Sequence, residues 1–168
     1  SDKRILILVS DNFQDMEAMY PLYRFREAGM DVVVAGAEAK EYKGKHGYPL
    51  NADIAIEGCR SQDFDAVIIP GGWAPDAMRQ NKYMLDIVRE MHEANKVVAA
   101  ICHGAWVPIS AGITKGHTMT AYIAVKDDVI NSGASFVDEE VVVDGNLITS
   151  RKPDDLPAFC SAILDALG

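Results

Sequence analysis

The sequence predicts an α/β fold, in which helices cover both faces of a mostly parallel central sheet. The chain has 168 residues, of which 49% are hydrophobic and 24% charged, so we expect a single globular domain over residues 1–168. Its aliphatic runs are continuous rather than alternating, which is typical of strands buried on both faces. Segments with helical periodicity separate these runs, and strands that alternate with helices form parallel sheets.

The first predicted strand covers residues 5–9, where charged residues precede an aliphatic run and polar residues follow it. A helical pattern then extends over residues 13–25 and is closed by Gly29, a residue type that commonly ends helices. Pro21 lies inside this pattern and predicts either a kink or the true first turn of the helix. Residues 31–35 form a second aliphatic run and predict a second buried strand.

The middle of the chain continues the alternation. Residues 40–56 are polar and rich in turn formers, and their weak alternation predicts a hairpin outside the main series of elements. Residues 65–70 predict the third core strand, and Asn81 is placed to cap a helix that follows it. The apolar face of that helix consists of Met84, Ile87, Val88 and Met91. Residues 97–101 predict the fourth core strand.

The last third of the chain begins with a helix that follows the fourth strand directly. Residues 122–131 have a helical pattern. Residues 140–143 and 147–149 flank an Asp-Gly-Asn turn at 144–146, which is a strong signal for a β-hairpin. Residues 154–167 predict a closing amphipathic helix.

The charge balance limits the kinds of partner that we expect. The chain carries 16 basic and 25 acidic residues, a formal net charge of −9. An acidic surface repels phosphate groups, so neither nucleic acid nor an anionic membrane surface is an expected partner. The apolar run near the N-terminus is too short for a signal peptide or a membrane span.

The cysteines also indicate a compartment. Cys59, Cys102 and Cys160 are odd in number, lie far apart and form no CxxC pair. This argues against a disulfide scaffold and against a zinc ribbon, and it suits a reducing cytoplasm, where we expect the protein to be located.

Three strand ends predict where the functional site lies. Ligands of parallel α/β sheets bind at the carboxyl ends of the strands. The segments that follow three of the predicted strands are polar or rich in glycine: residues 10–17, 70–76 and 102–104. We therefore expect these segments to converge around the site.

The segment Ala100-Ile101-Cys102-His103-Gly104 has the pattern of a nucleophile elbow, with cysteine at the position of the nucleophile. Such a turn between strand and helix is tight and needs small neighbours, and it holds the nucleophile in a sparsely populated backbone region. We expect the start of the helix to stabilise a thiolate and to lower the thiol pKa below about 8.5. The alternative is that Cys102 is a small buried hydrophobic residue, as most free cysteines are.

Three further residues are candidates for this site. His103 is a general base or the ion-pair partner of a thiolate, unless it is a structural histidine. The backbone N–H groups of Gly72 and His103 are candidates for an oxyanion hole, although a Gly-Gly pair also suits a plain turn. Glu17 has apolar neighbours; if buried it would stay protonated and donate to the sulfur, and otherwise it is a solvated surface residue.

The remaining histidines and cysteines have no predicted chemical role. We interpret His46, His92 and His117 as surface residues, because their spacing does not suggest a ligand set. Cys59 is expected in a loop and Cys160 in the core. No metal is expected, because adjacent cysteine and histidine residues chelate poorly; no cofactor is expected either.

Several segments together resemble a known family. They are residues 13–17 (FQDME), 70–76 (PGGWAPD), 100–104 (AICHG), 126–128 (KDD), 141–146 (VVVDGN) and 149–151 (TSR) with Pro153 and Asp154. In this order they resemble the PfpI intracellular cysteine protease/amidase group of the ThiJ/PfpI superfamily, which is related to class I glutamine amidotransferases. The resemblance implies a flavodoxin-like three-layer sandwich.

The resemblance also implies roles for the candidate residues. Cys102 would be the nucleophile, His103 its partner and Glu17 the acid that contacts the sulfur. In PfpI-type enzymes a carboxylate from an adjacent subunit orients the histidine, and the matching position here is Asp76. The resemblance thus implies a homo-oligomer whose site is completed at an interface.

Three positions depart from the family pattern. Asp76 stands where glutamate is usual and is one methylene shorter. Trp73 replaces a residue that is often arginine, and Trp106 lies where Pro-Gln is common after the elbow. Two indoles at the mouth would narrow the pocket and favour small aldehydes over peptides, unless they serve only in packing.

Three functions remain open from the sequence. The first is a cysteine hydrolase that acts on small peptides or amides. The second is cofactor-independent glyoxalase or deglycase chemistry on methylglyoxal or glycated amines, which uses the same thiol. The third is a peroxide sensor or stress-protective chaperone, because an accessible thiolate oxidises readily.

Overall fold

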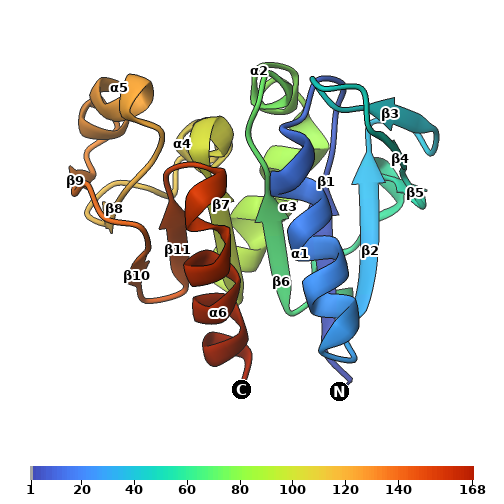
Figure 1. The fold of residues 1–168 in the computed structure, drawn as a ribbon. Coiled ribbons are helices and arrows are strands. Elements are labelled where there is room, and N and C mark those ends of the chain that lie inside the picture. The colour runs from blue at the N-terminus through green and yellow to red at the C-terminus, as the bar shows by residue number, and fades with distance from the viewer. Residues whose placement is uncertain (1) are drawn as a thin grey trace.

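The structure, a computed structural model, describes residues 2–168 and is built around a seven-stranded sheet (Figure 1). The strands follow the order β10-β11-β7-β6-β1-β2-β5. Their bounds are Arg4–Leu8 (β1), Asp31–Gly36 (β2), Ile54–Ala55 (β5), Ala66–Ile69 (β6), Val97–Ile101 (β7), Val142–Asp144 (β10) and Leu147–Ser150 (β11). Neighbouring strands run parallel except for the antiparallel pair β10–β11, so the predicted, mostly parallel sheet is confirmed.

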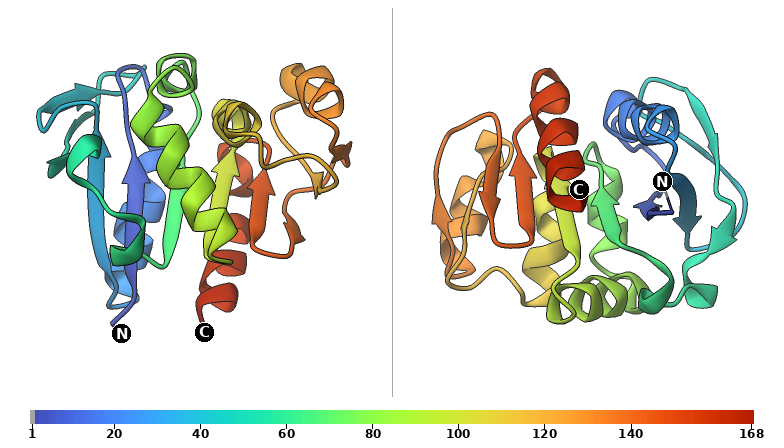
Figure 2. Two further views of the ribbon diagram at one scale, coloured as in Figure 1. Left: turned by 180° about the vertical axis from the view of Figure 1, so that it is seen from behind. Right: turned by 90° about the horizontal axis from the view of Figure 1, so that it is seen from below.

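Helices cover both faces of this sheet. Their bounds are Asp15–Glu27 (α1), Ala74–Met78 (α2), Lys82–Glu93 (α3), Trp106–Ala111 (α4), Lys126–Asn131 (α5) and Leu156–Leu167 (α6). Helices α1 and α6 lie side by side on one face, and α3 lies with α4 on the other (Figures 1 and 2). The three-layer α/β/α sandwich expected from the sequence is therefore present. Within residues 2–168, no helix is both long and apolar enough to traverse a bilayer.

Local sequence explains where the two long central helices begin. The Asn81 side chain accepts hydrogen bonds from the amides of Tyr83 (3.0 Å) and Met84 (3.2 Å), as predicted for a helix cap. The predicted apolar face of α3 is buried. Helix α1 is capped by Gln14 and continues through Pro21, so the alternative that Pro21 marks its first turn is wrong.

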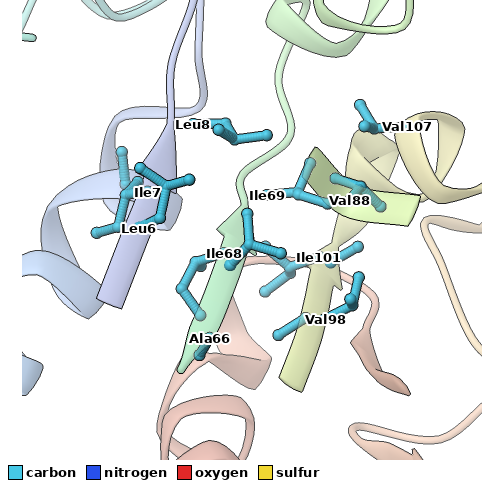
Figure 3. Close-up of a cluster of buried hydrophobic side chains, with 14 of the residues drawn as sticks. Leu6, Ile7, Leu8, Ala66, Ile68, Ile69, Val88, Val98, Ile101 and Val107 are labelled. Atoms are coloured by element: carbon cyan, nitrogen blue, oxygen red, sulfur yellow. The ribbon is translucent and has the colours of Figure 1, made fainter. Parts of the chain in front are cut away.

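The core lies between the sheet and these helices. The side chains of β1, β6 and β7 are buried almost completely, which explains why their sequences are aliphatic without alternation. Figure 3 shows Ile7, Ile68 and Ile101 from three neighbouring strands in one cluster with Val88 from α3 and Val107 from α4. This rigid core holds the ends of the central strands in place.

Several small elements complete the fold. The predicted hairpin in residues 40–56 is confirmed as β3 (Glu41–Lys43) paired with β4 (Pro49–Asn51). The sequence did not predict α2, β5 or the parallel pair of β8 (Thr118–Met119) and β9 (Ser135–Phe136). Short 3-10 turns are Ile56–Gly58 (η1), Ser61–Asp63 (η2), Cys102–Ala105 (η3), Ile123–Val125 (η4) and Pro153–Asp155 (η5). The last two form the first turns of the helices predicted over residues 122–131 and 154–167.

Candidate active site

The segments that follow β1, β6 and β7 meet at one edge of the sheet, the upper edge in Figure 1. They enclose a cavity of about 330 Å³. Its lining residues are Gln14, Glu17, Lys45, Gly72, Trp73, Cys102, His103, Tyr122, Lys152 and Pro153. The predicted convergence of the strand ends is therefore observed, and four of the five candidate site residues line the same cavity.

Cys102 has the strained backbone that the elbow pattern predicts. It follows β7 directly and has a φ of 63°, in the left-handed region that side chains rarely adopt. The need for a small neighbour is also visible, because a Cβ atom on Gly104 would lie 2.4 Å from the carbonyl oxygen of Ile69. The turn therefore depends on close contact with the end of β6.

Glu17 is completely buried beside this turn. Its Oε1 atom accepts a hydrogen bond of 2.8 Å from the amide of Gly71, whereas its Oε2 atom is buried without a hydrogen-bond partner. Burial raises the pKa of the Glu17 carboxyl to about 8, so the group is protonated at pH 7. The expectation of a buried, protonated glutamate holds, and the solvated alternative is wrong.

The Cys102 thiol is less acidic than the elbow pattern suggested. Burial, and after it the charge of an ionised Glu17, raises the thiol pKa to about 12, while the amides of His103 and Gly72 and the charge of Lys45 act in the opposite direction. The sequence analysis expected the start of a helix to lower the thiol pKa, and this expectation is wrong. The turn η3 has only four residues, so its stabilisation of a thiolate is outweighed by the removal of the sulfur from water. At neutral pH Glu17 is protonated and does not repel a thiolate. The thiol nevertheless needs a base to lose its proton.

His103 is placed to be that base. Its Nδ1 atom lies 3.4 Å from the Cys102 sulfur. Burial and the charge of Lys45 lower the pKa of the imidazole, so it is neutral at pH 7 and can accept a proton. The ring stacks on Tyr122 at a centroid distance of 5.0 Å and an interplanar angle of 26°. These contacts limit the ring's orientation.

The Gly-Gly segment after β6 is more than a plain turn. The amides of Gly72 and His103 both interact with the Cys102 sulfur. A Cβ atom on Gly71 would lie 2.7 Å from Oε1 of Glu17 and 2.8 Å from Cβ of Cys102. A glycine is therefore required here for the three strand ends to approach one another.

Of the two indoles expected at the mouth, only Trp73 lines the cavity, whereas Trp106 packs behind the His103 ring. Trp73 is 65% exposed, and its ring centroid lies 6.3 Å from that of His103. The Trp106 ring meets His103 edge-on at 5.3 Å, and its Nε1 atom donates a hydrogen bond of 3.0 Å to Asp128. The exposure of Trp73 argues against a role in packing alone and agrees with a narrowed mouth.

Asp76 is the one candidate that is not brought to the site within its own chain. It is exposed on α2, and its side chain does not line the cavity formed by the described residues 2–168. Its carbonyl oxygen accepts a hydrogen bond from Gln80.

Sequence reasoning missed three residues that line the cavity. Lys45 comes from the β3–β4 hairpin, whose backbone is tied to the chain after β1 by a hydrogen bond of 2.9 Å from the Lys45 amide to the carbonyl of Phe13. Tyr122 is held by a bond of 3.3 Å from its amide to the carbonyl of Cys102, and Lys152 follows β11. No motif marks these residues, and only their place after strands or in a polar hairpin could have suggested them.

Outside the site, two interpretations need correction. His92 and His117 are half-buried rather than on the surface: their rings lie 5.2 Å apart, and Nδ1 of His117 lies 3.1 Å from a carboxylate oxygen of Asp144. Cys160 is in the core and His46 is exposed, as expected. Across residues 2–168, no three His, Cys, Asp or Glu side chains are grouped so that they could hold a metal ion.

Two named proteins are similar to this chain over nearly its whole length. It is 46% identical over 156 residues to a deglycase from Pyrococcus abyssi, covering 93% of this chain and 94% of that protein. It is 43% identical over 166 residues to the Bacillus subtilis protein named "Putative cysteine protease YraA", covering 98% of each chain.

A solved structure has the same fold. It is a two-domain protein from Anabaena variabilis with DJ-1/ThiJ/PfpI-like and ferritin-like domains, which matches with a TM-score of 0.98 and 44% identity. The match covers 99% of this chain and 48% of that protein, so the chain spans about half of its length. The model of the DJ-1/PfpI family matches residues 3–166. The chain therefore belongs to the DJ-1/PfpI family.

Proposed function

We propose that this protein is a cysteine-dependent hydrolase of the deglycase type, which removes small dicarbonyl adducts from amines. One observation carries this proposal: a thiol, a neutral imidazole 3.4 Å from it and a protonated carboxyl share one small cavity. That set can add a sulfur to a carbonyl carbon and move protons on neighbouring carbons without a cofactor. The name of the Pyrococcus abyssi relative supports the same chemistry.

The reaction can be written for an adduct of methylglyoxal with an amine. Cys102 attacks the carbinolamine carbon while His103 takes the thiol proton; the C–S bond forms, the C–N bond breaks and the amine leaves with a proton. The resulting hemithioacetal loses a proton from one carbon and regains one on the next, through an enediol, with His103 or Glu17 as the carrier. The product is a thioester of lactate. Water hydrolyses it to lactate and the free thiol, and no external oxidant or reductant is needed.

Hydrolysis of small peptides or amides is the second candidate. It is favoured by the two backbone amides, of Gly72 and His103, that converge on the sulfur, because such a pair is suited to an oxyanion. The name of the Bacillus subtilis relative supports this reading. The narrow cavity bordered by Trp73 makes an extended peptide the less suitable substrate.

One assay separates these functions. The purified protein is incubated with methylglyoxal-modified N-acetyllysine and, separately, with a fluorogenic peptide amide; lactate, free amine and fluorescence are measured. We expect lactate and free amine in equal amounts, and neither with Cys102→Ala. Peptide cleavage without lactate would favour the amidase. Failure of both reactions, with peroxide oxidation of Cys102 intact, would favour the sensor reading.

We further propose that the site is completed in a homo-oligomer, in which Asp76 of one subunit approaches His103 of another. Its exposure on α2 is compatible with such a contact. We also propose a cytoplasmic location, in keeping with the three cysteines, all of which are free.

A further inference from the structure

The cavity around Cys102 differs in charge from the rest of the protein. The chain as a whole has a formal charge of −9. The cavity is nevertheless lined by two lysines, Lys45 and Lys152, and its one carboxyl group, on Glu17, is protonated at pH 7. The lining of the cavity is thus cationic although the chain as a whole is anionic.

Lys45 projects its charge onto the reacting groups. Its ammonium lies 6.0 Å from the centre of the exposed Trp73 ring, at the border of the cavity. Its charge contributes to lowering the pKa of Glu17, of Cys102 and of His103, so its field reaches all three. Among residues 2–168 no carboxylate lies within ion-pair distance of this ammonium.

Lys152 approaches from the opposite segment, after β11. Its neighbour Arg151 is neutralised, because its guanidinium binds Asp155 at 2.9 and 3.0 Å and Asp138 at 3.0 Å. Lys152 has no such partner within the described part of the chain. Two exposed lysines without a carboxylate partner among residues 2–168 therefore line the cavity that holds the thiol, and they come from segments more than a hundred residues apart.

We propose that Lys45 and Lys152 form an anion subsite, which selects carbonyl substrates that carry a carboxylate close to the reacting carbon. A bound carboxylate would supply the ion-pair partner that both lysines lack, and it would orient the substrate carbonyl toward Cys102. The substrates of this class are 2-oxo acids with an aldehyde function and amine adducts of them. This inference rests on the proposed addition of the thiol to a carbonyl.

The step with the simplest member of the class, glyoxylate, is balanced. The sulfur forms a bond to the aldehyde carbon, the π electrons of the C=O bond move to oxygen, and that oxygen takes a proton. The thiol proton leaves through His103, so the sum is one thiol and one aldehyde giving one hemithioacetal. The carboxylate itself is unchanged and stays on the lysines.

Alkylation of Cys102 tests the subsite without any turnover. Iodoacetate and iodoacetamide have nearly the same shape and attack the same sulfur, but only iodoacetate is an anion. We take the rate constant for iodoacetate divided by that for iodoacetamide. A change in the thiol pKa or in access to the sulfur affects both reagents equally and cancels in this ratio, which therefore reports the electrostatic potential at the sulfur. We expect this ratio to exceed that of free cysteine about three- to tenfold at low salt, and to fall toward it in 0.5 M NaCl.

Variants assign the effect to the two lysines. Lys45→Gln and Lys152→Gln should each reduce the ratio about threefold, whereas Lys45→Arg and Lys152→Arg should retain it. Lys82→Gln, an exposed lysine at the start of α3, is the matched control and should leave it unchanged. A ratio equal to that of free cysteine, or one that the glutamine variants do not change, would overturn the subsite.

Turnover then separates this inference from the proposed function. Glyoxylate has no second carbonyl to take up the shifted proton, so its hemithioacetal can only revert, and the substrate to use is its amine adduct. The wild-type protein should release N-acetyllysine from its glyoxylate adduct, giving free amine and glyoxylate, with a higher kcat/KM than from its glyoxal adduct, and Lys45→Gln should lose this preference. A preference for iodoacetate in a protein that turns over no carbonyl compound would sink the proposed function and keep the subsite. Turnover of glyoxal without any alkylation preference would sink the subsite alone.

Discussion

At the scale of single residues, the central feature is a buried carboxyl group that shares a site with a buried thiol. Water is excluded from both, so each is harder to ionise than in solution. The Oε2 atom of Glu17 has no hydrogen-bond partner, which makes an ionised carboxylate there especially unfavourable. Keeping an acid next to Cys102 therefore lowers the stability of the folded protein at pH values where the Glu17 carboxyl ionises in the unfolded chain.

This cost predicts how stability depends on pH. The folded-state pKa of Glu17 is about 8, against 4.5 for the ordinary group. A raised acid pKa means that the native state holds a proton which the unfolded chain releases, so stability declines as pH rises from 4.5 to 8. Glu17→Gln removes this decline. We expect the variant to be more stable than the wild type by roughly 2 to 4 kcal/mol at pH 8.5 and about equally stable at pH 4.5.

Thermal or urea unfolding at both pH values measures this difference. Glu139→Gln, at an exposed position, is the control and should leave the pH profile unchanged. If Glu17→Gln were less stable than the wild type at pH 8.5, the carboxyl would be ionised and favourably paired in the native state.

The His103 imidazole predicts the acid limb of the activity profile. Because burial and Lys45 lower its pKa, the base form persists below pH 6.5, and kcat/KM should decline only at more acidic pH. In Lys45→Gln one of these causes is absent, so the acid limb should move to higher pH. Rate profiles between pH 4.5 and 8 on a neutral substrate such as glyoxal test this. An acid limb that does not move would mean that another group controls it.

At the scale of elements, the site depends on how closely the turn after β6 approaches α1 and the elbow. A Cβ atom on Gly71 would lie 2.7 Å from Glu17 and 2.8 Å from Cys102, within distances that real Cβ contacts essentially never show. We therefore expect Gly71→Ala to lower kcat/KM at least about 100-fold, since a misplacement of 1 Å is enough for such a loss. The global fold should remain, as judged by circular dichroism.

Gly58→Ala is a matched control for this glycine. A Cβ atom there would meet Ile54 at 3.5 Å, an ordinary contact, and Gly58 does not line the cavity. It should retain full activity. Full activity of Gly71→Ala would show that the turn after β6 can move away from α1 and the elbow without loss of catalysis.

At the scale of the whole molecule, the open question is whether one chain holds a complete site. Asp76 lies outside the cavity of its own chain. If it acts across an interface, Cys102→Ala and Asp76→Ala should each be inactive alone, but mixed oligomers should regain activity. In a dimer one intact site forms per mixed pair, so about a quarter of the wild-type activity is expected after equal mixing and subunit exchange.

Two controls make this result decisive. A mixture of Cys102→Ala with wild type gives the activity expected from dilution alone, and size-exclusion chromatography gives the oligomeric state. An active Asp76→Ala variant would remove Asp76 from the site, whatever the oligomeric state.

The local features of the fold could be read from the sequence. Continuous aliphatic runs predicted the buried strands, and the cap at Asn81 predicted the start of α3, because each depends on residues close together in the chain. The elbow at Cys102 and its sparsely populated backbone region were likewise predicted from five consecutive residues, and the φ of 63° confirms that prediction. Short elements such as β5 and α2 have too few residues to show a period, and only their pairing and packing define them.

What the sequence by itself determined is the α/β fold and the position of one thiol at the end of a core strand. Only the tertiary structure decided the surroundings of that thiol: the proximity of Lys45 and Lys152, the stacking of Tyr122 on His103 and the burial that raises the pKa of Glu17. The physical reason is that electrostatic and desolvation energies depend on distance in space. Segments far apart in the chain meet at this edge of the sheet, and no local pattern records which side chains then face one another.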